Sequence, residues 1–157
     1  MRVDDVMTST PLCCTISCTA QVAAALMRQG DTGIIPVVEK FGRRVVGVVT
    51  DRDLCLNVVA RGHIPSRVLV AECMTPNPIF CHPEDELSTV LGLMKHYQVR
   101  RIVVVDANDE LKGVVSIGDL VRSGEVDAID IYDALTEICT PSVTPAQLRA
   151  AAACAGT

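Results

Sequence analysis

The stretch GVVTDRDL, at residues 47–54, runs from small apolar residues into Thr50 and then reaches a carboxylate, Asp53, three residues later. This spacing predicts a β-strand that leads into a capped helix, because a hydroxyl and a carboxylate so placed exchange hydrogen bonds with the first backbone groups of a helix. A helix start also offers free N–H groups and a positive dipole end to a phosphate. The same stretch is therefore compatible with a ligand site.

The stretch has a counterpart, GVVSIGDL, at residues 113–120. Three further segments recur in the same order: DVMTSTPLCC (5–14) with ECMTPNPIFC (72–81), ALMRQG (25–30) with GLMKHY (92–97), and IIPVVE (34–39) with RIVVVD (101–106). Two unrelated segments of this composition do not share so many ordered matches, so the chain is a tandem pair.

Each copy predicts the order strand, helix, strand, strand, helix. A short alternating strand follows Pro11 or Pro78, and β-branched runs at 34–39 and 101–106 predict buried strands. The third strand ends at Thr50 or at Ser116. One face of the predicted helix in the second copy is apolar at positions i, i+3, i+4 and i+7: Leu87, Val90, Leu91 and Met94.

We divide the chain into repeat 1 (1–62), repeat 2 (63–123) and a C-terminal helix and tail (124–157). An amphipathic helix is predicted over 128–138, with Ile131, Ala134, Leu135 and Ile138 on its apolar face. Thr144 and Pro145 then predict the start of a short Ala-rich helical segment. The fold class is mixed α/β.

Composition limits the classes of function. The chain has 157 residues, 49% of them hydrophobic, and a formal net charge of −5. No apolar run approaches the ~20 residues that span a bilayer, and the acidic start MRVDDVMTS does not resemble a signal peptide. We therefore expect a cytoplasmic protein without a membrane partner. Basic tracts are lacking and aromatic residues are 3% of the chain, so nucleic acid is not an expected partner.

The eight cysteines include no CxxC pair, so no metal site is expected. Cys14 and Cys81 are equivalent and alternate with apolar residues, which predicts core positions. Cys55 and Cys73 are also expected on apolar faces. The remaining four, Cys13, Cys18, Cys139 and Cys154, are less constrained, and a redox role or a disulfide involving them stays open.

The order of these segments resembles the CBS domain, here as a tandem pair (a Bateman module) over residues 3–123. The length and trailing helix are similar to short stand-alone bacterial CBS-pair proteins, including the hypoxic-response type. The resemblance implies two βαββα units whose sheets pack about a pseudo-twofold axis. It also implies clefts that bind adenosine-containing ligands (AMP, ADP, ATP or S-adenosylmethionine) and a regulatory, non-catalytic role on a separate, unknown partner protein. A homodimer formed through apolar helix faces is expected.

The family pattern assigns phosphate contact to a hydroxyl and ribose contact to the carboxylate three residues later. Carried over, these are Thr50 with Asp53, and Ser116 with Asp119. Arg52 has Gly118 as its counterpart, so the two sites are chemically unequal and a phosphorylated ligand is expected to prefer the site with Arg52. A solvated residue in the first helical turn is the alternative interpretation of Arg52.

Lys95, His96, Arg100 and Arg101 form the densest basic cluster. A solvated helix end accounts for Lys95 and His96. Arg100 and Arg101 open a buried strand, and the resemblance implies that basic residues there face the cleft between the repeats and pair with phosphates. Repeat 1 has Gly33 and Ile34 at these positions.

The resemblance places adenine against apolar residues near the first strand of each repeat: Pro11, Leu12 and Cys13, with Pro78, Ile79 and Phe80. Ordinary core packing is the alternative for each of them. Val103 replaces Pro36 in repeat 2, which is expected to alter the local backbone and to affect nucleotide binding there.

Two other classes of function remain open. The first is a stress-response or redox-responsive dimer that binds no nucleotide and uses its cysteines. The second is an enzyme, which is not favoured because the three histidines form no recognisable catalytic arrangement and no GxGxxG turn is present.

Overall fold

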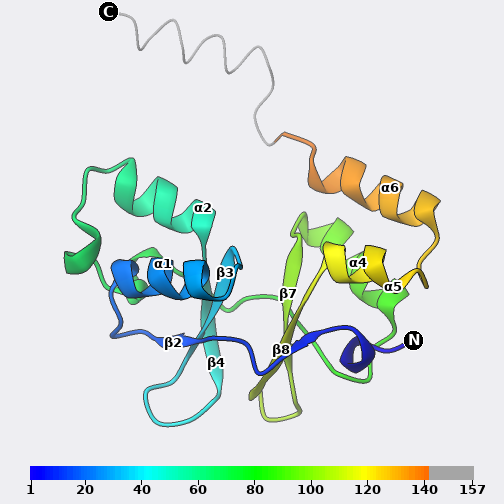
Figure 1. The fold of residues 1–157 in the computed structure, drawn as a ribbon, viewed down its shortest axis with the longest axis horizontal. Helices are drawn as coiled ribbons and strands as arrows, with labels where there is room; N and C mark the ends of the chain where they lie inside the picture. Colours follow the sequence, from blue (N-terminus) through cyan, green and yellow to red (C-terminus); the bar gives the residue numbers. More distant parts are fainter. Residues whose placement is uncertain (142–157) are drawn as a thin grey trace, which may run out of the picture.

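The computed structural model describes residues 1–141, and the predicted segment at Thr144 and Pro145 lies outside them. Figure 1 shows two similar α/β halves side by side, each with its helices on one side of a sheet. The elements of repeat 1 are β2 (Cys14–Thr15), α1 (Ala20–Gln29), β3 (Ile34–Val38), β4 (Val45–Thr50) and α2 (Asp51–Leu54), which continues as a π-helical turn (Cys55–Val59). The predicted order βαββα is confirmed.

Repeat 2 has the same order. Its elements are β6 (Phe80–Cys81), α4 (Leu87–Tyr97), β7 (Arg101–Val105), β8 (Leu111–Ser116) and α5 (Ile117–Ser123). The four apolar residues predicted on one face of α4 are all buried. Their side chains fill the core of repeat 2, so the helical periodicity was interpreted correctly.

Each sheet borrows its outer strand from the leading segment of the other repeat, which the sequence did not reveal. The leading elements are a 3₁₀ helix (Val3–Asp5) and β1 (Thr8–Ser9) in repeat 1, and a 3₁₀ helix (Pro65–Arg67), α3 (Val70–Cys73) and β5 (Thr75–Pro76) in repeat 2. The strand orders are β2-β3-β4-β5 and β6-β7-β8-β1. Val3 accordingly packs in the core of repeat 2, and Val70 in the core of repeat 1.

Gly47 and Gly113, which are equivalent in the two repeats, leave space for the outer strands β5 and β1 to pack closely. A Cβ on Gly47 would lie 2.7 Å from Sδ of Met74 and 3.0 Å from the carbonyl oxygen of Thr75. A Cβ on Gly113 would lie 2.5 Å from Sδ of Met7 and 2.9 Å from the carbonyl oxygen of Thr8. Close backbone approach therefore explains why Met, Thr and Gly recur at these positions in both repeats.

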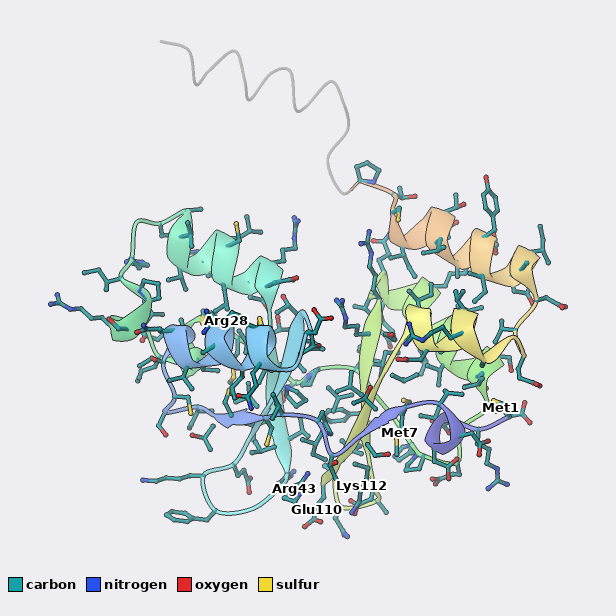
Figure 2. All side chains as sticks on the ribbon, viewed as in Figure 1. Met1, Met7, Arg28, Arg43, Glu110 and Lys112 are labelled. Carbon is teal, nitrogen blue, oxygen red and sulfur yellow. The ribbon has the colours of Figure 1, made fainter. Side chains whose placement is uncertain are left out.

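The two sheets face each other across a shared apolar core. This inter-sheet core consists of Ile34, Val38, Val45, Val48, Val103, Val105, Leu111 and Val114, with Cys13 and Phe80 half-buried against it. Most members come in equivalent pairs, such as Val38 with Val105 and Val48 with Val114, as a pseudo-twofold arrangement requires. The hairpins between the last two strands of each sheet also meet, because Leu111 N donates to the carbonyl of Arg43 at 2.9 Å. Figure 2 labels Arg43, Glu110 and Lys112 at this junction.

The C-terminal helix α6 (Ala128–Ile138) has the predicted bounds. Ile131, Ala134 and Ile138 are buried against repeat 2, and Leu135 packs beside them. Polar contacts fix α6 on α4, since Lys95 pairs with Asp133 and the Gln98 amide donates to the Glu137 carbonyl at 3.0 Å. Repeat 1 has no equivalent covering helix within residues 1–141.

Replacing Pro36 by Val103 leaves the antiparallel pairing unchanged but alters the parallel one, in line with the expected local difference: Val103 pairs with Phe80 of β6, whereas Pro36 has no partner in β2. In the antiparallel ladders Pro36 pairs with Val48, and Val103 pairs with Val114. Both ladders then shift register at equivalent places, between Val37 and Val38 and between Val104 and Val105. Proline is tolerated in β3 because β2 pairs only with the two residues that follow it.

The cysteines divide by burial. Cys14, Cys73 and Cys81 are buried, and burial raises the pKa of the Cys14 and Cys81 thiols to about 12, as expected for core thiols. The prediction for Cys55 was wrong, because its side chain is exposed. Leu54 takes the inward position on that helix, so the following residue turns outward, as the equivalent Val121 also does. The seven cysteines of the described chain are free thiols.

Candidate functional site

The helix start after β4, which we call the first site, has the predicted capping geometry. The backbone N and Oγ1 of Thr50 donate to Oδ2 of Asp53 at 2.9 and 2.8 Å, and the Asp53 N donates back to Thr50 Oγ1 at 3.1 Å. Both residues are half-buried. One carboxylate oxygen is thus committed to the backbone, and the helix start is held in a fixed conformation.

The helix start after β8, the second site, repeats this geometry. The backbone N and Oγ of Ser116 each donate to Oδ2 of Asp119 at 2.7 Å, and the Asp119 N donates to Ser116 Oγ at 3.3 Å. The hydroxyl and the carboxylate are therefore shared by both repeats as capping groups. The two sites differ only in what surrounds them.

The second carboxylate oxygen has a different environment in the two sites. At the second site, Arg122 forms an ion pair with Oδ1 of Asp119, and its guanidinium lies beside Gly118. Leu56 occupies the position of Arg122 in repeat 1, and within residues 1–141 Asp53 Oδ1 makes no hydrogen bond or ion pair. The first site thus offers an acceptor that the second site has already paired.

Arg101, a residue of the other repeat, also approaches the first site. Asp51 N donates to the Gly33 carbonyl at 3.1 Å, which places the start of α2 beside the start of β3. A Cβ on Gly33 would lie 2.6 Å from Oδ2 of Asp51 and 3.4 Å from a guanidinium nitrogen of Arg101. Arg101 of β7 therefore reaches across to the helix start of repeat 1. The absence of a side chain on Gly33 leaves room for this approach.

The two arginines of the predicted cleft point to different partners. The Arg100 guanidinium donates to Sγ of Cys139 at 3.4 Å, which places it against the end of α6. Arg101 instead lies beside Gly33 of the first site. At the second site the position of Arg101 is taken by Ile34, whose side chain is buried in the inter-sheet core. Only the first site receives a guanidinium from the opposite repeat in the described chain.

The predicted helix-end role of Lys95 agrees with its surroundings. The hydrogen bond from Lys95 to Asp133 raises the pKa of the lysine, and the ring of His96 packs edge-on against that of Tyr97. Both residues lie on α4, which packs against α6. Neither belongs to the helix-start sites.

The structure divides the six residues assigned to adenine, all of which are half-buried. Leu12 and Ile79 pack into the cores of their own repeats, with Leu12 against Gly30 at the end of α1. Cys13 and Phe80 face the inter-sheet core instead. Pro11 and Pro78 precede these residues outside the strands. An adenine bound here would therefore meet Cys13 or Phe80 on the side where the repeats face each other.

Sequence reasoning missed two residues of the sites. Arg122 follows Asp119 by three residues, a spacing that brings oppositely charged side chains together on a helix, so this pair was predictable. Asp51 has no acidic counterpart in repeat 2, and its contact with Gly33 depends on the pairing of β3 with β4. Arg2, Arg52 and Arg101 are exposed cations that form no ion pair within the described chain.

Metal and membrane features give no further site in the described part. No group of three or more His, Cys, Asp or Glu side chains within residues 1–141 is arranged to hold a metal ion. None of the described helices is long and apolar enough to cross a membrane.

The two repeats, the exchanged strands and the paired helix starts define a tandem CBS pair. A family model of the CBS domain matches residues 3–60 and again 70–125, so the chain belongs to the CBS-domain family. It is 36% identical over 126 residues to the protein YlbB of Bacillus subtilis, covering 80% of this chain and 84% of that protein. It is 28% identical over 137 residues to hypoxic response protein 1 of Mycobacterium tuberculosis, covering 87% of this chain and 93% of that protein.

Solved structures show the same fold. A hypoxic response protein crystallised with two coordinated zinc ions is 26% identical, with a TM-score of 0.70 over 81% of this chain and all (100%) of that one. A CBS domain protein of Pyrobaculum aerophilum complexed with AMP is 23% identical, with a TM-score of 0.72 over 87% of this chain and 99% of that one. The predicted family and fold class are therefore confirmed.

Proposed function

We propose that this chain is a regulatory module that binds an adenosine-containing nucleotide, chiefly at the first site, and acts on a separate protein. The observation that carries the proposal is the unpaired Oδ1 of Asp53 at a helix start that the guanidinium of Arg101 approaches from the opposite repeat, beside Gly33. A carboxylate with a free oxygen accepts a ribose hydroxyl, and guanidinium groups bind phosphate. The fold can accommodate such a ligand, since the Pyrobaculum aerophilum protein was crystallised with AMP.

Each residue has a proposed role in this complex. Asp53 accepts from the ribose, Thr50 contacts a phosphate while it caps the helix, and Arg52 and Arg101 neutralise phosphate charge. Asp119 and Ser116 form a weaker site, because binding a ribose there requires Asp119 to release Arg122. Arg100 faces Cys139, so we assign the phosphate contact to Arg101.

Cysteine-based redox sensing is a less favoured function. The Cys14 and Cys81 thiols are buried with pKa values of about 12, and a protonated buried thiol is a poor nucleophile. Within residues 1–141, the exposed Cys55 and Cys139 form no disulfide.

Isothermal titration calorimetry with AMP, ATP and S-adenosylmethionine tests the proposal. The wild type is expected to bind at least one of them, and the double variant Asp53→Ala/Asp119→Ala is expected to lose that binding while it retains its circular dichroism spectrum. Flat titrations of the wild type with all three compounds, or undiminished binding by the double variant, contradict the proposal.

We also propose a homodimer. Val22, Leu56 and Val59 are exposed on α1 and the helix that follows β4, at 44%, 47% and 66%. Within residues 1–141, no helix covers those of repeat 1 as α6 covers α4. Multi-angle light scattering is expected to give the mass of two chains at micromolar concentration, and a monomer mass contradicts the proposal.

A further inference from the structure

A hollow of about 440 Å³ opens at the outer end of repeat 1, on the far side of the helix from the first site. It is lined by residues at and after the π-helical turn, whereas Thr50 and Asp53 lie at the N-terminal end of that helix. In Figure 1 this part of the chain, the loop and short helix that follow α2, forms the end of the molecule opposite to α6. We call it the basic hollow.

Three basic side chains line the basic hollow: Arg61, His63 and Arg67. Asn57 adds an amide, and Ile64 and Val68 add apolar surface. Arg61 and Arg67 form no ion pair within the described chain, although the protein has a formal net charge of −5. Two arginines without a carboxylate partner thus line one concave surface.

The single acidic residue of the basic hollow does not cancel this charge through pairing. Glu72 lines the hollow, but its Oε2 accepts a hydrogen bond from the backbone N of Leu69 at 2.7 Å, at the start of α3. The carboxylate is therefore engaged in capping the helix. The local formal charge from Arg61, Arg67 and Glu72 remains positive before His63 is counted.

The backbone that carries the basic residues is fixed. The His63 N donates to the carbonyl of Val58 and the Gly62 N to that of Val59, both at 3.0 Å, and the Arg67 N donates to the carbonyl of Ile64 at 2.9 Å. The preceding turn is π-helical, a conformation that is rare in helices and frequent at functional sites. The backbone positions of the basic residues are thus set by the local fold, which limits the backbone entropy lost when they bind a ligand.

Repeat 2 has a hollow at the equivalent end, and its charge is opposite. This acidic hollow of about 300 Å³ is lined by Glu86, Glu125, Asp127 and Asp130. By the repeat alignment Asp127 corresponds to Arg61, and Met1, which also lines it, corresponds to Val68. The two hollows therefore share some lining positions but carry opposite charge.

We propose that the basic hollow is a second ligand site that binds a small phosphate-bearing anion, independently of the first site. Planar guanidinium groups bind phosphate oxygens in a bidentate manner, and a volume of this size suits a small molecule. The apolar wall of Ile64 and Val68 favours a phosphate that carries an organic group over the bare ion.

Calorimetric titration with pyrophosphate tests the proposal with two variants of equal charge change. The wild type is expected to bind pyrophosphate, and Arg61→Gln/Arg67→Gln is expected to lower the affinity by about tenfold or more, as the loss of charge-assisted hydrogen bonds implies. Arg52→Gln/Arg101→Gln removes the same charge from the first site and is expected to leave at least one binding event unchanged. All four residues are exposed, so both variants should fold.

The position of the bound anion is checked by amide chemical shifts in ¹H–¹⁵N spectra of the wild type. Shifts at residues 61–67 that vanish in Arg61→Gln/Arg67→Gln support the proposal. Three results overturn it: no binding by the wild type at millimolar pyrophosphate, equal losses in both variants, or shifts confined to residues 50–53. The last result would place the anion at the first site and leave the proposed function intact.

Discussion

The two helix starts have the same capping hydrogen bonds and differ in which charges surround the carboxylate. At the first site Asp53 retains a free oxygen, and Arg101 approaches from the other repeat. At the second site Arg122 pairs with that oxygen of Asp119. A duplicated module therefore keeps the groups that fold each helix start, while neighbouring residues decide which copy is available to a ligand.

Single substitutions of the two carboxylates should separate the sites most strongly. Asp53→Ala is expected to lower AMP affinity by about tenfold or more, because a hydrogen bond to a charged group contributes about 1.5–3 kcal/mol. Asp119→Ala is expected to change it by less than about threefold, since that carboxylate is already paired. Calorimetry measures both values, and equal losses in the two variants contradict the inequality of the sites.

Transferring the pairing arginine to repeat 1 should weaken the first site. Leu56→Arg places a guanidinium three residues after Asp53, as Arg122 is placed after Asp119, and Leu56 is 47% exposed, so the fold of the chain tolerates the substitution. AMP affinity is expected to fall by several-fold, about 1 kcal/mol for a half-exposed ion pair. Leu56→Gln, which adds no charge, is the matched control. Leu56 also belongs to the proposed dimer surface, and the glutamine control removes the same apolar side chain. An affinity unchanged by the arginine would show that Asp53 Oδ1 is not used.

Filling the space beside the first site should have a smaller effect. In Gly33→Ala the new methyl group would displace the Asp51 carboxylate, which is the flexible end of a side chain. We expect about a two- to fivefold change in AMP affinity and a melting temperature near that of the wild type. Leu26→Ala, a half-buried core truncation in the same repeat, should do the reverse by lowering stability with little effect on affinity. A large loss of stability in Gly33→Ala would contradict this account.

The smallest expected effect is on thermal stability and concerns Asp106, in the hairpin turn between β7 and β8 of repeat 2. Lys112 and the backbone N–H groups of Asn108 and Glu110 bond to Asp106 and lower its pKa to about 2. Because this folded-state pKa lies below the unfolded value of about 3.9, the stabilisation is present above that pH and is lost as the pH falls towards 2. Asp106→Asn should therefore lower the melting temperature slightly at pH 7 and not at pH 2. A difference between wild type and variant that persists at pH 2 would contradict the assignment.

The sequence predicted what periodicity and duplication encode. The βαββα order, the buried face of α4, the bounds of α6 and both capping boxes follow from patterns within a few residues. The exchange of β1 and β5 between the sheets was not predictable, because their two-residue pairings depend on contacts such as Met74 with Gly47. The same limit applies to the site: the Asp119–Arg122 spacing is local, whereas the approach of Arg101 to Gly33 needs the packed sheets.

Cys55 shows a further limit. Its apolar neighbours suggested an inward position, but Leu54 takes that position, and the next residue of a helix lies about 100° further around the axis. The equivalent Val121 is likewise exposed, so residue type alone did not identify the buried face.

The number of AMP molecules bound per chain tests the central claim most directly. Calorimetric titration of the wild type should give one tight event per chain, and Arg122→Leu, which gives repeat 2 the residue of repeat 1, should add a second event by freeing Asp119 Oδ1. Two equivalent events in the wild type, or loss of the single event in Arg122→Leu, would contradict the claim that the pairing of this carboxylate decides which repeat binds.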